Sequence, residues 1–330
     1  MVIKDLNPLL NQLIPRIARF DPPAIIEFAE VISVLITART PPTLSAGDRE
    51  KLRTTAMVEI SAAAGRLTSM PADPGSWVQK KIDAIAHRQA RFIGEDRDRA
   101  AAAQRHMLLP KTFEAHGMEV AVEVRPYDLA SGDVFDYSVT PRDALFALVD
   151  IAGKGPAAST LAAYSLAHFR TQSKQTRDPR KLTNGLNNSL FAATAPSESA
   201  AVAIARWTPA GRLLQISNAG YPLPLLIRER SVRRLGDGGQ PVGLFPSGRF
   251  SVSRTQPCPG DLILLASDGI SEQKTNTDRY FNTASIARSL ASSPTASMEA
   301  LMAQSWQIFA QRTGRRIQHD DRTIAIIRFS

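Results

Sequence analysis

The sequence predicts an α+β fold with mainly antiparallel sheets, preceded by a domain made only of helices. Residues 1–94 show helical patterns without strand-like alternation, whereas the strand patterns after residue 117 follow one another in groups without helical crossovers between them. The length of 330 residues agrees with about two domains. We therefore expect a helical domain over residues 1–94, a linker helix over 95–116 and a mixed domain over 117–330.

Prolines divide the first domain into four predicted helices. The first covers residues 6–20, and the pair Pro22-Pro23 opens a second that reaches residue 38, because proline is well tolerated in a first helical turn. The pair Pro41-Pro42 ends the second helix, and two further helices begin near residues 45 and 73. Four helices with short connections predict a small bundle.

The fourth helix carries an apolar repeat and runs to about residue 109. Val78, Ile82, Ile85, Gln89 and Phe92 follow a 4-3-4-3 spacing, which is typical of the seam between two helices. The repeat then restarts out of phase, so it is shorter than the about three to four heptads of a sustained coiled coil. Two interpretations stay open: packing onto the bundle, and a homodimer formed through this helix.

A β-hairpin is predicted at the start of the second domain. Alternating valines from Val120 to Val124 and the apolar run 144–149 have strand patterns, and the segment 140–143 has the composition of a turn, with Pro141 favouring its first central position. If the turn is centred between residues 141 and 142, residues whose numbers sum to 283 face each other. Asp133 and Asp150 form such a pair.

Two opposed aspartates would repel each other on one face of a sheet, where facing Cβ atoms lie about 4.5–5.5 Å apart. A divalent cation between them converts this repulsion into coordination. The alternative is a register shifted by one residue, which leaves one aspartate in solvent.

Further carboxylates stand at predicted strand ends. Asp268 follows the apolar run 262–266, and Asp320 and Asp321 immediately precede the last strand. Each aspartate by itself is a common turn or cap residue. Together with Asp133 and Asp150 they form an all-carboxylate set without Cys or His, which favours Mg²⁺ or Mn²⁺ over Zn²⁺.

Several other chemistries are excluded by spacing. Lys154 is followed by Gly155 and not by Ser or Thr, so a P-loop is absent. A cysteine phosphatase needs an arginine six residues after its cysteine, but Leu264 stands at that distance from Cys258. The sequence also contains no Gly-x-Ser-x-Gly motif, which excludes the nucleophile elbow of serine hydrolases.

Composition restricts partners and location. The net charge is +9, but the basic residues are scattered, aromatic residues make up only 6%, and no nucleic-acid motif is present, so we expect no nucleic acid as partner. Cys258 is the single cysteine, which excludes an intrachain disulfide. Without a membrane-length apolar run or signal-peptide pattern, we expect a cytoplasmic protein without membrane contact.

Six ordered motifs resemble the SpoIIE-like and RsbU-like bacterial phosphatases, which are metal-dependent (PPM) relatives of protein phosphatase 2C. The similarity covers residues 104–330, and its motifs are Leu108-Leu109-Pro110, Ser131-Gly132-Asp133-Val134-Phe135-Asp136, Asp150-Ile151-Ala152-Gly153-Lys154-Gly155, Asn218-Ala219-Gly220-Tyr221-Pro222, Ser267-Asp268-Gly269 and Asp320-Asp321-Arg322-Thr323. The resemblance implies a two-sheet antiparallel β-sandwich flanked by helices, with two Mn²⁺ or Mg²⁺ ions at one end.

The resemblance also implies roles for single residues. Asp150 would bridge both ions, the carbonyl of Ile151 would complete one coordination sphere, Asp268 and Asp320 would hold the other ion, and Asp133 would act mostly through a water ligand. A water activated by the two ions would attack phosphorus directly, so no phosphoenzyme is required. Either His319 or a second water would protonate the leaving oxygen.

The sequence departs from the usual family pattern at three positions. Ser131 replaces a glycine, Ala152 replaces a serine, and Tyr221 stands where histidine is common. Because none of the three is an expected metal ligand, we expect an active enzyme, with substrate choice left open.

By this resemblance we expect a phosphoserine/phosphothreonine protein phosphatase involved in signal transduction and stress response. Its substrate would be a phosphorylated STAS-domain anti-anti-sigma factor or a similar regulator in a partner-switching pathway. The helical domain of residues 1–94 would be regulatory and would receive an activating protein. Two alternatives are a catalytically silent binding module for a phosphorylated regulator and a phosphohydrolase acting on a small molecule.

Overall fold

The chain divides into two compact units, Met1–Asp96 and Arg97–Ser330. The computed structural model describes residues 7–18, 24, 27–33, 46–64, 72–107, 112–194, 198–314 and 316–330. Among these residues, no helix is both long and apolar enough to cross a membrane.

The first unit is helical, as predicted. Its described elements are α1 (Asn7–Ala18), α3 (Ala46–Ala64), a helical segment at residues 27–33 and the first part of α4 (Pro74–Met107). These elements contribute fully buried side chains to one core, among them Leu13, Phe28, Ile60 and Ile82. Val78, Ile82 and Ile85, the first members of the apolar repeat, belong to this core. The apolar repeat therefore packs, at least over these three positions, within its own unit.

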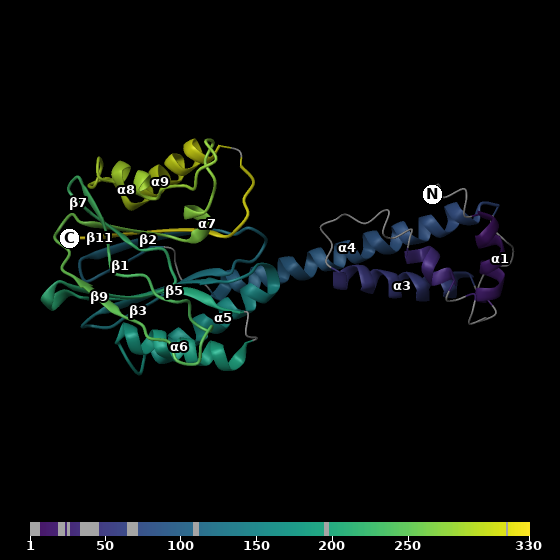
Figure 1. The fold of residues 1–330 in the computed structure, drawn as a ribbon, viewed down its shortest axis with the longest axis horizontal. Helices are drawn as coiled ribbons and strands as arrows, with labels where there is room; N and C mark the ends of the chain where they lie inside the picture. The colour runs from purple at the N-terminus through teal and green to yellow at the C-terminus, as the bar shows by residue number, and fades with distance from the viewer. Residues whose placement is uncertain are drawn as a thin grey trace. The chain divides into compact units, whose positions relative to one another are not determined.

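The second unit contains two antiparallel sheets (Figure 1). The six-stranded sheet A has the order β1 (Thr112–Ala115), β2 (Met118–Arg125), β11 (Arg322–Phe329), β10 (Leu262–Ala266), β7 (Leu225–Arg228) and β8 (Ser231–Arg234). The five-stranded sheet B has the order β3 (Asp133–Val139), β4 (Ala144–Ile151), β5 (Ala200–Thr208), β6 (Leu213–Ala219) and β9 (Val252–Thr255). The predicted antiparallel α+β architecture is confirmed.

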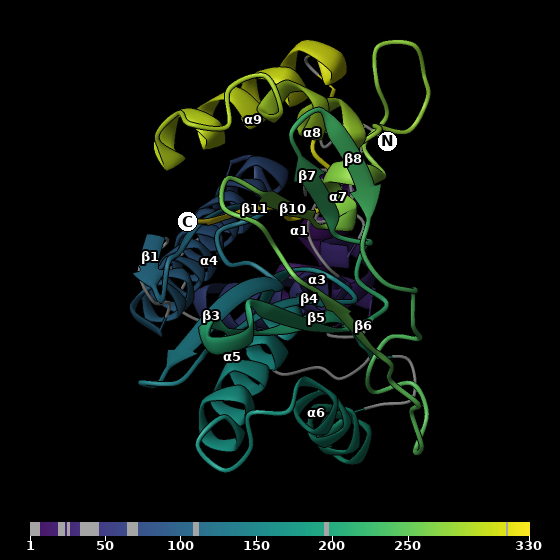
Figure 2. The ribbon, with the colours of Figure 1, turned by 90° about the vertical axis from the view of Figure 1, so that its left-hand side faces the viewer.

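The two sheets face each other, and helices cover their outer sides (Figure 2). Helices α5 (Gly155–Gln172) and α6 (Pro179–Ala193) cover sheet B, and α8 (Ala284–Leu290) and α9 (Met298–Thr313) cover sheet A. The short helix α7 (Asp268–Ser271) follows β10 directly. This arrangement is the two-sheet sandwich that the family resemblance implies.

Strand β4 shows why its sequence is continuously apolar. Ala144, Phe146 and Leu148 pack in the core between the sheets. Leu145 and Val149 pack in a second core with α5 and α6. A strand buried on both faces needs apolar residues at every position, so the run 144–149 shows no alternation. Asp150 is therefore a charged group at the end of a fully apolar strand.

The linker helix is shorter than expected. We predicted it over residues 95–116, but α4 ends at Met107 and residues 112–115 form β1. A tight connection with positive φ at His116 and Gly117 joins β1 to β2, and Thr112 to Ala115 pair with Ala121 to Met118. Pairing with β2 therefore places residues 112–115 in a strand, outside the helix. Strand β8 and helix α7 were not predicted.

Candidate active site

The predicted hairpin register is confirmed, and it places two aspartates side by side. Asp133 on β3 pairs directly with Asp150 on β4. The turn is closed by a hydrogen bond of 2.9 Å from the Thr140 amide to the Asp143 carbonyl. Asp143 is buried and forms ion pairs with Arg177 and Arg206, at 2.8 and 2.7 Å. These bonds stabilise the turn that sets the register.

Asp133 is only 2% exposed, and the surrounding chain orients it. The Thr323 hydroxyl donates to Asp133 Oδ2 at 2.6 Å, and the Asp133 amide donates to Ser131 Oγ at 3.0 Å. Burial, with a smaller contribution from the charge of Asp321, raises the pKa of Asp133 to about 7. A buried carboxylate with so high a pKa is poorly stabilised by the protein alone.

The carboxylate of Asp150 lies close enough to Asp133, Asp268 and Asp320 to interact with their charges. Burial raises its pKa well above the ordinary value, and the charges of Asp133, Asp268 and Asp320 raise it further. Asp268 stands in the first turn of α7, and its pKa is raised by burial and then by the charge of Asp320. The structure thus brings Asp133, Asp150, Asp268 and Asp320 to one end of the sandwich.

The donor chemistry of this centre fits a divalent cation. Asp133 Oδ1 and Asp150 Oδ2 are buried oxygens without a hydrogen-bond partner. Leaving such carboxylate oxygens unpaired is costly, whereas hard cations bind them well. Within the described residues, no three Asp, Glu, His or Cys side chains already surround a common point. The carboxylate of Asp320 already has two partners: its Oδ1 accepts a hydrogen bond from the Asp321 amide at 3.0 Å, and its Oδ2 lies 3.2 Å from Lys154 Nζ.

Asp321 has a different environment from its neighbour Asp320. Its two carboxylate oxygens accept hydrogen bonds of 2.6 Å from the amides of Tyr127 and Gly132. Asp321 therefore connects the start of β11 to the segment that carries Asp133. Gly269 packs so closely here that an added Cβ would overlap with the Asp321 carbonyl. The small residue after Asp268 thus allows α7 to approach β11.

Helix α4 contacts the same segment. Gln104, 8% exposed, donates to the Ser131 carbonyl at 2.6 Å and accepts from the Ser131 amide at 2.9 Å. Arg170 of α5 bonds both the Met107 carbonyl and Asp136 Oδ2, each at 2.6 Å. The C-terminal part of α4 is therefore bonded directly to Ser131 and, through Arg170 of α5, indirectly to Asp136.

Three other residues that the sequence analysis named are Ile151, His319 and Tyr221. The carbonyl of Ile151 lies near Gly132, where an added Cβ would stand 3.3 Å from it. His319 is exposed. Tyr221 is buried, and burial, followed by the charges of Asp133, Asp150 and Asp268, raises its pKa well above the usual range.

Sequence reasoning did not identify Gln104, Lys154 or Thr323 as site residues. Thr323 stands in the quoted motif beside Asp320, so its place in the motif was the available signal. Lys154 likewise stands in the quoted motif that begins at Asp150, but its partner Asp320 is 166 positions away in sequence. Gln104 lies outside the six motifs, and its partner Ser131 is 27 positions away.

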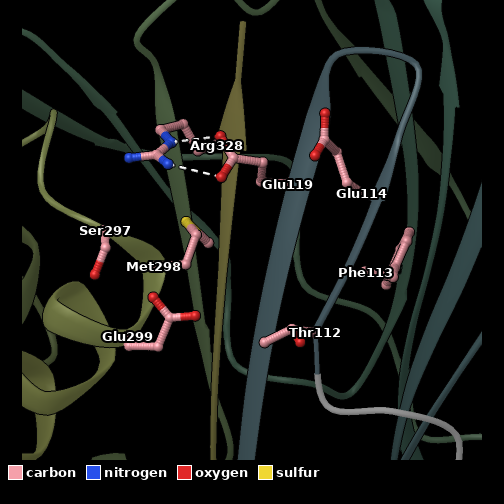
Figure 3. Close-up of a pocket in the computed structure, with 8 residues that line it drawn as sticks. All are labelled: Thr112, Phe113, Glu114, Glu119, Ser297, Met298, Glu299 and Arg328. Atoms are coloured by element: carbon pink, nitrogen blue, oxygen red, sulfur yellow. Dashed lines mark hydrogen bonds and ion pairs between the residues drawn. The ribbon is translucent and has the colours of Figure 1, made fainter.

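A cavity of about 290 Å³ lies elsewhere on the second unit, between the β1–β2 hairpin and α9 (Figure 3). Arg328 crosses it to form a two-pronged ion pair with Glu119, at 2.8 and 2.7 Å. None of the four aspartates lines this cavity. It is therefore separate from the candidate active site.

Comparison with known proteins agrees with this arrangement. The family model of stage II sporulation protein E (SpoIIE) matches residues 140–330. No curated protein matches the chain.

Solved structures share the fold at low sequence identity. The SiaA PP2C domain of Pseudomonas aeruginosa is 20% identical, with a TM-score of 0.65 over 73% of this chain and 98% of that one. The RsbU and RsbW domains of a Mycobacterium tuberculosis protein are 23% identical, with a TM-score of 0.57 over 64% of this chain and 60% of that one. The SpoIIE phosphatase domain from Bacillus subtilis, with a regulatory fragment, is 16% identical, with a TM-score of 0.56 over 67% of this chain and 64% of that one.

Proposed function

Because the chain belongs to the SpoIIE family of PP2C-like protein serine/threonine phosphatases, we propose that it dephosphorylates a small regulatory protein at its aspartate centre. The substrate is a phosphorylated STAS-domain anti-anti-sigma factor or a similar regulator of a partner-switching pathway. The observation that best supports catalysis at this centre is the pairing of Asp133 on β3 with Asp150 on β4. Each of these carboxylates has one buried oxygen without a hydrogen-bond partner. The solved RsbU and RsbW domains support the choice of substrate class.

Two Mn²⁺ or Mg²⁺ ions are the proposed cofactors. The side chains of Asp133, Asp150, Asp268 and Asp320 and the carbonyl of Ile151 would hold them. Bound ions of this kind acidify water and neutralise the charge of phosphoryl oxygens. No proton transfer by His319 is required by this proposal.

The chain's own residues prepare the centre. Thr323 and Ser131 fix the orientation of Asp133, and Asp321 holds Gly132 in place. Burial at the end of the sandwich excludes water from Asp133 and strengthens its interaction with a cation. Rigid strands thus orient the carboxylates in advance, as electrostatic catalysis requires.

The helical domain of residues 1–94 is the proposed regulatory module, and α4 is the proposed route to the active site. Support comes from the contacts of Gln104 with Ser131 and of Arg170 with Met107 and Asp136. A displacement of α4 would move the segment that carries Asp133. An activating protein that binds the helical domain, or a homodimer formed through it, would act by this route.

The first test is hydrolysis of p-nitrophenyl phosphate and of a phosphothreonine peptide with and without Mn²⁺. The full chain, residues 95–330 and Asp150→Ala are compared. We expect Mn²⁺-dependent turnover that disappears in Asp150→Ala, and a rate difference between the two lengths.

Three results would contradict the proposal. Turnover that persists in Asp150→Ala would reject the aspartate centre. Equal rates for the two lengths, with and without partner, would reject regulation by residues 1–94. Binding of a phosphorylated partner without turnover, with unchanged affinity in Asp268→Asn, would identify a silent binding module.

A further inference from the structure

Lys154 lies beside the aspartate centre and forms an ion pair with one of its carboxylates, Asp320. Its Nζ atom stands 3.2 Å from Asp320 Oδ2 and 4.9 Å from the centre of the Tyr127 ring. The Lys154 and Asp320 side chains are 41% and 39% exposed. An ion pair this exposed is weak, so a divalent cation can displace Lys154 from Asp320.

The surroundings of Lys154 give the ammonium group a second partner besides Asp320. The exposed Tyr127 ring offers a cation–π contact that does not depend on Asp320. Lys154 also lies between Gly153 and Gly155, both with positive φ, and an added Cβ at either glycine would meet nothing within 4 Å. The segment is therefore open to solvent, and a ligand has room beside it.

The start of α5 adds partial positive charge beside Lys154. Lys154 is the residue before α5, and the first turn of this helix contains no acidic residue. The amino end of a helix carries partial positive charge, which adds to that of the ammonium group. Lys154 follows Asp150 by four residues and pairs with Asp320, so its ammonium group lies beside two of the proposed metal ligands.

We propose that Lys154 is a displaceable cation: it holds Asp320 while the metal site is empty, and it binds the phosphoryl oxygens of the substrate once a divalent ion takes Asp320. Lys154 thereby becomes a substrate-binding residue only in the metal-loaded protein. This inference rests on the proposed phosphatase function for its substrate, but its metal part does not require turnover.

The test measures binding on the full chain, using Lys154→Gln and the matched control Lys181→Gln. Lys181 is an exposed lysine of α6, so the control removes the same charge away from the centre. Calorimetry measures the affinity of each variant for Mn²⁺. Of the two proposed Mn²⁺ ions, we expect the one with the lower affinity to bind Lys154→Gln about two- to fivefold more tightly than the wild type, because Asp320 no longer has a competing cation. Lys154→Arg should keep the wild-type affinity for Mn²⁺.

Inorganic phosphate is then titrated into the Mn²⁺-saturated proteins. We expect about tenfold weaker binding to Lys154→Gln, since one charge-assisted hydrogen bond is lost, and no change in Lys181→Gln. Unchanged or weaker Mn²⁺ binding in Lys154→Gln, or the same gain in both variants, would overturn the competition with metal. Equal phosphate affinity in all variants would overturn the role in binding phosphoryl oxygens.

These readouts separate the inference from the enzyme assignment. A protein without turnover whose Lys154→Gln variant gains Mn²⁺ affinity and loses phosphate affinity would support the role of Lys154. The same result would count against the phosphatase proposal.

Discussion

At the scale of single residues, two aspartates of sheet B have surroundings of opposite charge, and their pKa values shift in opposite directions. Asp150 is surrounded by other carboxylates, which raise its pKa. The pKa of Asp143 is lowered, because the hydrogen bonds and charges from Arg177, Arg206 and Thr140 outweigh the effect of its burial. The first arrangement opposes folding without a cation, whereas the second supports folding.

The same substitution should therefore have opposite effects at these two positions. In metal-free protein at neutral pH, Asp150→Asn should raise the melting temperature, because it removes charge repulsion. Asp143→Asn should lower it, since loss of the carboxylate weakens two arginine pairs at a cost of about 1–3 kcal/mol. Thermal unfolding monitored by circular dichroism measures both effects. For a unit of this size, a change of about 1 kcal/mol in stability shifts the melting temperature by about 2–4 °C. A lower melting temperature in both variants would contradict the charge argument.

The pKa of Asp133 predicts how the metal-free protein responds to pH. Its value is about 7 in the folded protein against an ordinary 3.8, so between these values the folded state binds more protons than the unfolded state. Stability should therefore fall as pH rises from about 4 to 7. Urea unfolding with a chelator present should show this slope, and Asp133→Asn should flatten it. An equal slope in the variant would assign the effect to other groups.

At the scale of elements, the centre depends on three segments that approach closely: the β3–β4 hairpin, α7, and the start of β11. Gly269 lies against the Asp321 carbonyl, and the Asp321 side chain bonds Gly132 and Tyr127. Helix α4 adds a fourth contact through Gln104 and Ser131. Small changes at these contacts would therefore move carboxylates relative to one another.

Gly269→Ala should separate α7 from β11. The added methyl group overlaps with a backbone carbonyl, so we expect a loss of about 1–3 kcal/mol of stability and at least tenfold weaker Mn²⁺ binding. Gly238→Ala is the matched control, because a Cβ there would meet nothing within 4 Å. Chemical unfolding and calorimetry measure both effects. Equal Mn²⁺ affinity in the two variants would show that the position of α7 does not affect the centre.

Gln104→Ala should weaken the connection between α4 and the active site. The buried amide and carbonyl of Ser131 lose their partners, which costs about 1–3 kcal/mol. We expect the rate difference between the full chain and residues 95–330 to shrink in this variant. Arg105→Ala, on the exposed side of α4, is the control. An undiminished difference in Gln104→Ala would exclude this contact as the route of regulation.

At the scale of the whole molecule, two units have separate cores. Phe28 is fully buried in the helical unit, and Phe146 is buried between the two sheets of the second unit. The proposed metal ligands all belong to the second unit. Stability and metal binding should therefore respond independently to changes in the two cores.

Substitution of each phenylalanine tests this independence. Phe28→Ala and Phe146→Ala should each cost about 3–5 kcal/mol, in different unfolding transitions of the full chain. Phe28→Ala should leave Mn²⁺ affinity unchanged, whereas Phe146→Ala should reduce it. Differential scanning calorimetry resolves the transitions. A single transition lowered equally by both substitutions would show that the units unfold together.

Local sequence patterns were sufficient for much of this protein. The apolar run 144–149 and the turn at residues 140–143 predicted the register of the β3–β4 hairpin, because strand periodicity and turn chemistry act over a few residues. The alternating valines correctly indicated a strand, but this strand, β2, pairs with β1 and β11 in sheet A and is not part of that hairpin. The absence of helical crossovers between strands predicted antiparallel sheets. The aspartates at strand ends indicated a centre for hard cations.

Only the tertiary structure decided which groups meet at that centre. Thr323 bonds Asp133 across 190 positions of sequence, and the pair of Lys154 with Asp320 joins β4 to the start of β11. Pairing with β2 also decided that residues 112–115 form strand β1, within the range predicted for the linker helix. Periodicity reports which face of an element is buried, whereas side-chain contacts between distant segments depend on how the sheets and helices pack.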